Sequence, residues 1–208
     1  MFVRDMGKRM DPEAPAETYP LFSRTGPAYL TPIYPEYHTA LFPDSILRTE
    51  SPDDFIEQEP HRNAIRKAYI SRSWFRDLHC GDVIVFYRTK TPGQSAYYTS
   101  VVSTIGIVES VVDDISSAED FVSLCRKRSV FTDTELRKHW DYKPRRRPFV
   151  VNFLYAYSLP KRPNLEQLIE LGVVRDTRSV PRGFEQISSN AFAAILEASN
   201  ADEAVVVD

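Results

Sequence analysis

The residues best suited to binding chemistry form a basic, aromatic strip between positions 126 and 147 of the 208-residue chain. Lysine and arginine can neutralise phosphates with release of counterions, and a flat indole ring can stack on an unpaired base. The strip predicts recognition of a single-stranded nucleic acid or a flipped-out base. The same pattern fits a solvated, salt-bridged helix face with its tryptophan packed inward, and the sequence leaves both readings open. The candidate binding residues here are Trp140, Lys143, Arg145, Arg146 and Arg147.

A second candidate segment is the loop that follows a predicted strand over residues 64–70. It holds Ser71, Arg72 and Trp74, and Arg88 ends the next predicted strand. We expect these four residues to line one concavity, with Ser71 at a base edge and the two arginines at phosphate or base acceptors. The alternative is a strand-to-helix connection in which Trp74 and Phe75 belong to the core.

Other kinds of chemistry find little support in the sequence. The four histidines form no HxxxH or HxH pair, and neither cysteine has a metal-ligand spacing. Cys80 lies against a Gly81-Asp82 turn, where a small buried residue is expected rather than a nucleophile. The chain also lacks a GxSxG elbow, a Walker loop and a GxGxxG turn. We therefore predict no catalytic residue, no metal and no cofactor.

Charge and composition limit the possible settings of such a site. The chain has 26 Lys and Arg against 29 Asp and Glu, a net charge of −3, so nucleic-acid affinity must come from a local patch. Two cysteines without CxxC spacing suit a reducing compartment, which predicts a cytoplasmic protein. The apolar run over residues 149–157 is broken by Asn152 and is too short to cross a bilayer, so no membrane partner is expected.

The elements that must position these residues are mainly strands. Apolar, β-branched and aromatic runs predict strands over Val83 to Arg88, Thr99 to Val112 and Phe149 to Tyr157, in one mostly antiparallel, curved sheet. Gly106 is expected to mark a bulge or bend. Capping-box patterns at Ser116/Glu119 and Thr132/Glu135 predict two short helices. We expect an extended lead-in over residues 1–27, one domain over 28–200 and a frayed acidic tail over 201–208.

The order of these motifs resembles a known superfamily. The strand opening Gly81-Asp-Val-Ile-Val-Phe-Tyr87 and the return strand Ile105-Gly-Ile-Val-Glu109 are similar to those of PUA-like domains, the small β-barrels that include the EVE and ASCH domains. Residues 32–44, 69–73 and 132–135 look like the PUA-like domain found behind GNAT acetyltransferase domains in bacterial proteins. This resemblance covers about residues 28–196, and residues 1–5 are similar to the last strand of the acetyltransferase domain.

The resemblance implies an α+β fold: a PUA-like small, mostly antiparallel β-barrel with flanking helices. It implies a non-catalytic module that binds RNA or another single-stranded or modified nucleic acid at a concave face. One alternative is a regulatory or protein-interaction appendage of a GNAT acetyltransferase, and another is an enzyme that acts on RNA or nucleotides. The Gln/Arg-x-x-Gly-x-Gly/Ala turn that holds acetyl-CoA in GNAT enzymes is absent, so acetyl transfer by this chain alone is not expected.

Overall fold

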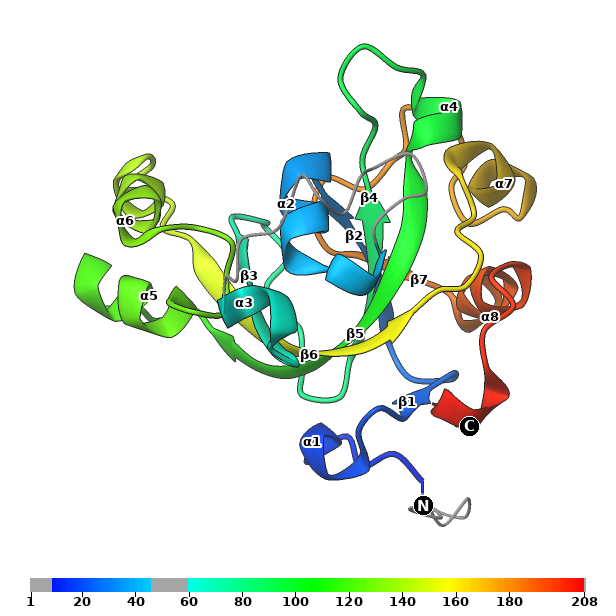
Figure 1. The fold of residues 1–208 in the computed structure, drawn as a ribbon, viewed down its shortest axis with the longest axis horizontal. Helices are drawn as coiled ribbons and strands as arrows, with labels where there is room; N and C mark the ends of the chain where they lie inside the picture. Colours follow the sequence, from blue (N-terminus) through cyan, green and yellow to red (C-terminus); the bar gives the residue numbers. More distant parts are fainter. Residues whose placement is uncertain (1–8, 46–59, 208) are drawn as a thin grey trace.

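A six-stranded, strongly curved sheet dominates the computed structural model, which describes residues 9–45 and 60–207 (Figure 1). The strand order is β3-β6-β5-β4-β2-β7, and every neighbouring pair is antiparallel except β2 with β4. The three strands predicted from apolar runs lie side by side as β4, β5 and β6, which confirms the predicted sheet. The strands are β2 (Ala28–Ile33), β3 (Arg66–Ser71), β4 (Val83–Arg88), β5 (Val101–Val112), β6 (Phe149–Ser158) and β7 (Glu185–Ile187).

The curvature of the sheet has a local cause in β5. The pairing of β5 with β6 changes register between Ile105 and Gly106 and again between Val108 and Ser110, as expected for a bulge near Gly106. A Cβ atom at Gly106 would lie 2.7 Å from Cδ2 of Phe153. Glycine is therefore required for β5 to pass this close to the ring, and the sheet can curl into a half-barrel.

Short helices flank the sheet on several sides (Figure 1). The Thr132/Glu135 capping box is present at the start of α6, whereas the cap of α5 is Ser117 rather than Ser116. The adjacent serine takes this role because its hydroxyl accepts the backbone N–H of Asp120. The helices are α1 (Pro15–Thr18), α2 (Pro35–Leu41), α3 (Pro60–Asn63), α4 (Ala96–Thr99), α5 (Ala118–Cys125), α6 (Asp133–Asp141), α7 (Leu165–Glu170) and α8 (Ser189–Ala198), with 3-10 turns over Pro43–Ser45 and Glu203–Val205.

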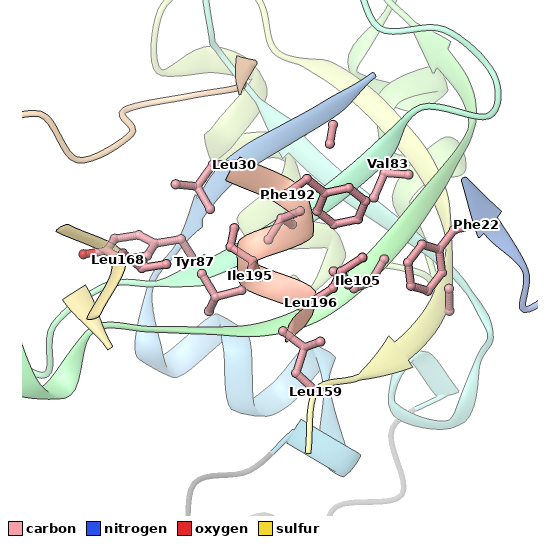
Figure 2. Close-up of a cluster of buried hydrophobic side chains, with 14 of the residues drawn as sticks. Phe22, Leu30, Val83, Tyr87, Ile105, Leu159, Leu168, Phe192, Ile195 and Leu196 are labelled. Atoms are coloured by element: carbon pink, nitrogen blue, oxygen red, sulfur yellow. The ribbon is translucent and has the colours of Figure 1, made fainter. Parts of the chain in front are cut away.

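The main core lies between the sheet and helices α7 and α8. Figure 2 shows Phe192, Ile195 and Leu196 of α8 packed toward strand residues that include Val83 and Ile105. All six residues of β4 are buried. Alternate residues of β4 therefore serve two cores, since Val83 belongs to this cluster and its neighbour Ile84 to the cluster on the other face.

A third cluster fixes helices α5 and α6 beside β3 and β6. Phe121 of α5 and Leu136 of α6 are fully buried there, together with Ala68 of β3 and Val150 of β6. The cluster attaches α6 to the edge strand β3. The C-terminal turn of α6 and the loop that follows it consequently lie next to the end of β3.

The expectations for the two ends of the domain were wrong in the part the structure describes. Phe22, which was assigned to an extended lead-in, is fully buried in the main core. The short strand β1 (Phe22–Ser23) pairs in parallel with β8 (Val206–Val207), so the acidic tail is joined to the start of the domain. Phe22 is a single aromatic residue after a segment rich in prolines and acidic residues, so no periodic pattern indicated its burial. Residues 1–5, compared above with an acetyltransferase strand, lie outside the described residues.

Candidate nucleic-acid interface

A cavity of about 1070 Å³ lies between the edge strand β3 and the end of β2. The two strands are joined across it by Tyr69, whose hydroxyl donates a hydrogen bond to the carbonyl oxygen of Pro32 at 2.6 Å. Loops that follow β3 and α6 and precede β7 complete the walls. The aromatic residues that line the cavity are Tyr34, Tyr37, Tyr69, Trp74, Phe75, Phe131, Tyr142 and Phe184.

The cavity has an excess of positive charge. Arg72, Arg146 and Arg182 line it, and Glu185 is the single acidic residue among the lining side chains that the structure describes. With the histidine neutral, three cations and one anion give a local charge of +2 in a chain whose net charge is −3. A concave site with this charge attracts anions.

Trp74 stands at the edge of the cavity with 85% of its surface exposed. The backbone of its loop is held by two serines: Ser71 Oγ accepts the N–H of Ser73 at 3.0 Å, and Ser73 Oγ accepts the N–H of Phe75 at 3.2 Å. Phe75 turns inward against Tyr29, with 5.2 Å between ring centroids. The core position is therefore taken by Phe75, and the indole of Trp74 is left at the surface.

Two of the arginines that line the cavity contact aromatic rings. The guanidinium carbon of Arg146 lies 3.8 Å from the centre of the Trp74 ring. Arg72 donates a hydrogen bond to the carbonyl oxygen of His139 near the end of α6, and its guanidinium lies 5.5 Å from the Tyr142 ring. Burial lowers the pKa of Arg72; Tyr142 opposes this shift, and Arg146 and Arg147 add to it. The arrangement thus brings several positive charges together in a partly buried site. A bound anion would stabilise these charges.

The basic strip predicted from the sequence is divided by the structure. Lys143 and Arg145 are exposed on the loop after α6, and Lys143 Nζ lies 5.1 Å from the Tyr142 ring. Arg146 enters the cavity. Arg147 turns the other way: it donates a hydrogen bond to the carbonyl oxygen of Trp140 and lies 3.7 Å from a carboxylate oxygen of Asp141. Of these cations, Arg146 alone is among the residues that line the described cavity.

Two further candidate residues, Trp140 and Arg88, do not line the cavity. Trp140 is 7% exposed and packs against Phe121 with ring centroids 5.6 Å apart, so the inward-packed alternative holds and its predicted base stacking is wrong. Arg88 is 2% exposed, and its Nη1 lies 3.3 Å from the carbonyl oxygen of Thr99. The expectation that Arg88 shares one concavity with Ser71, Arg72 and Trp74 is therefore wrong, because β4 is covered on both faces.

Several residues that line the cavity were not identified from the sequence. Tyr34, Tyr37 and Phe131 come from segments nearly a hundred positions apart, and Tyr37 meets Phe131 edge to face at 4.9 Å between centroids. His139 lines the cavity beside Phe131, and burial together with Arg72 lowers its pKa, against the opposing effect of Glu135. Of the lining residues outside the predicted set, Tyr142 could have been identified from the local sequence, because it stands next to the basic residues.

A separate buried polar group is Lys67 in β3. Its side chain is fully buried, and Nζ donates hydrogen bonds to the carbonyl oxygens of His61 at 2.7 Å and Arg62 at 3.1 Å. Burial lowers the pKa of Lys67 to about 8; Asp44 opposes the shift and Arg62 adds to it. Lys67 is absent from the residues that line the cavity. Nothing in the sequence distinguished this lysine from the exposed ones.

The buried Lys67 makes the stability of the protein depend on pH. Its pKa of about 8 lies below the reference value of 10.5, so the unfolded chain binds more protons than the folded chain between these values. The free energy of unfolding should therefore rise with pH in this window. Relative to Lys67→Met, the wild type should gain about 3 kcal/mol between pH 8 and 10.5, as measured by urea unfolding. A difference that stays constant with pH would show that the amine is not perturbed.

Across residues 9–45 and 60–207, no group of three or more His, Cys, Asp or Glu side chains could hold a metal ion. The helices in these ranges are also too short or too polar to cross a bilayer. The polar side chains that line the cavity are those of arginine and histidine, several hydroxyl groups and the carboxylate of Glu185.

Comparison with known proteins shows what the fold is. No family model matches the chain, and no curated protein matches its sequence. A solved structure does match: a Tyr-to-Phe variant of the ASCH protein ZmASCH from Zymomonas mobilis, with a TM-score of 0.56 at 10% identity. The match covers 82% of this chain and 96% of that one. The chain has a PUA-like, ASCH-type fold. The cavity is thus framed by the curved sheet expected from the resemblance, and aromatic residues of α2 and of the loops around α6 and before β7 add to its walls.

Proposed function

We propose that this PUA-like domain is a non-catalytic module that binds single-stranded nucleic acid, RNA above all, through an unpaired or modified base. The observation that carries the proposal is the exposed Trp74 ring in contact with Arg146, in a cavity that Arg72 also lines and that has a local charge of +2. Exposed aromatic rings stack on bases, and arginines bind the phosphates that flank them. An ASCH-type structural neighbour is compatible with this reading.

Each part of the cavity has a role in this proposal. Trp74 offers the stacking surface, and Tyr34 and Tyr142, which are 62% and 70% exposed, extend it along the rim. The hydroxyl groups of Ser71 and Ser73 lie in the same cavity and can hydrogen-bond a base edge. Lys143 and Arg145 lie on the exposed loop next to Arg146 and would follow the phosphate backbone outside the cavity.

Binding should be measured by fluorescence anisotropy with a labelled ten-nucleotide RNA, the same sequence as DNA, and an RNA duplex. We expect both single strands to bind and the duplex to bind more weakly, because its bases cannot stack on Trp74. Absence of binding to either single strand at low salt would overturn the proposal. Co-elution with a GNAT protein would then favour the regulatory alternative, and turnover of RNA or nucleotides would favour an enzyme.

The salt dependence of this binding gives a quantitative prediction. Arg146 and Arg182 line the cavity, and each phosphate neutralised on a single strand contributes about 0.7 to the slope of log K against log salt. Changing both residues to alanine should therefore flatten the slope by about 1.4 and weaken binding to every sequence similarly. Arg175→Ala removes one exposed cation that does not line the cavity and serves as the control. An unchanged slope in the double variant would exclude phosphate contacts at these two positions.

A further inference from the structure

One face of the Trp74 indole is already in contact with another side chain in the free protein. The guanidinium of Arg146 lies 3.8 Å from the ring centre, which is ordinary van der Waals contact. No base fits between two groups at this separation. Arg146 therefore fills the layer that a stacked base would take on that face of the indole.

The hydrogen bonding of Arg146 indicates that its guanidinium lies on Trp74 only while no ligand is bound. Its Nε is buried and finds no acceptor among the described residues, and the same holds for Nε of Arg72 in the same cavity. Buried donors without partners are rare in proteins and are costly. Two such donors in a positively charged cavity suit the oxygens of one anionic group.

The loop around Arg146 allows its side chain to move while its backbone stays in place. The residue lies in a bend between α6 and β6, where its N–H donates to the carbonyl oxygen of Lys143 at 2.9 Å. Next to it, Arg147 is fixed to the end of α6 through the carbonyl oxygen of Trp140 and through Asp141. Rotation of the Arg146 side chain alone can uncover the indole.

We infer that the base of a bound nucleotide replaces the guanidinium of Arg146 on Trp74, and that the displaced Arg146 joins Arg72 in binding the phosphate of that nucleotide. This inference rests on the proposed function and identifies its minimal ligand as one nucleotide unit. Arg72 is the fixed half of the phosphate site, because it is held to the carbonyl oxygen of His139. Arg146 is the movable half, and it discriminates a nucleotide from a nucleoside.

Arg146→Ala should have opposite effects on these two ligands, measured as competition by adenosine and AMP against the labelled RNA. AMP should bind about tenfold or more weakly, because a charge-assisted contact to phosphate is lost. Adenosine should bind roughly two- to fivefold more tightly, because no cation has to leave the indole. Arg146→Lys keeps the charge but not the planar stack, so AMP affinity should fall less than in Arg146→Ala. Arg175→Ala should leave both affinities unchanged.

The outcomes separate this inference from the function on which it rests. If labelled RNA binds and adenosine affinity falls or stays the same in Arg146→Ala, the exchange on Trp74 is wrong while single-strand binding stands. If both ligands lose affinity equally in Arg146→Ala, Arg146 supports the position of Trp74 and does not compete for it. If the wild type binds no single strand at low salt, the proposed function itself fails.

Discussion

Replacing Trp74 with alanine should weaken the binding of single-stranded RNA by about 1–3 kcal/mol, a loss of roughly five- to 150-fold in affinity. The indole is 85% exposed and borders the cavity, so its removal takes away the stacking surface without opening the core. The slope of log K against log salt should not change, because stacking releases no counterions. Anisotropy titrations at several salt concentrations measure both quantities.

The control for this prediction is Trp74→Phe, which keeps a ring that can stack. It should recover most of the affinity, whereas Trp74→Ala should not. Thermal unfolding should be nearly the same in all three proteins, since Phe75 rather than Trp74 packs toward the interior against Tyr29. Equal RNA affinity in Trp74→Ala and the wild type would contradict a stacking role for this residue.

The other tryptophan should behave in the opposite way. Trp140→Ala should lower the free energy of unfolding by about 3–5 kcal/mol, the usual cost of removing a buried aromatic side chain. Trp140 is 7% exposed, its ring packs on Phe121, and the guanidinium of Arg147 lies 4.5 Å from its centre. The cavity left behind would loosen α6 from α5 and β3. Urea unfolding followed by circular dichroism measures the change.

Trp140→Phe is the matched variant for the core. It preserves an aromatic contact with Phe121 and should cost clearly less stability than the alanine change. A stability loss below about 1 kcal/mol in Trp140→Ala would contradict the buried role, because surface substitutions have effects of that size.

The sheet could be predicted from the sequence because its central strands carry their own signal. Every residue from Val83 to Arg88 is buried, and such an apolar run reads as a strand without knowledge of its neighbours. The same run did not indicate that Arg88 is buried. A cation at the end of a strand is expected to be accessible to solvent, but both faces of this strand are covered. Phe22 was missed for a related reason, since one aromatic residue in a proline-rich segment gives no periodicity.

The site was predicted in part because some of its residues are close in sequence. Ser71 ends β3, Arg72 and Trp74 follow in the next loop, and the structure brings all three to the cavity. Arg146 joins them through the packing of α6 on β3, which no local pattern contains. Of the two tryptophans, the one in the basic strip proved to be buried. Spacing alone could not decide this, because a helix beside a basic segment presents one face inward.

The walls formed by Tyr34, Tyr37 and Phe131 could not be predicted at all. They meet because the half-barrel brings the end of β2 near β3 and because the loop before α6 closes over both. Such a juxtaposition is a property of tertiary packing. It also places His139, whose role in the sequence was undefined, against Phe131 with ring centroids 4.4 Å apart.

The central claim, that an unpaired base stacks on Trp74, is tested most directly by the fluorescence of that residue. The chain has two tryptophans, so Trp140→Phe leaves Trp74 as the sole indole emitter. Titration of this variant with unlabelled ten-nucleotide RNA should quench its emission and saturate at the Kd obtained from anisotropy. RNA that binds by anisotropy but leaves the emission of Trp74 unchanged would contradict the account.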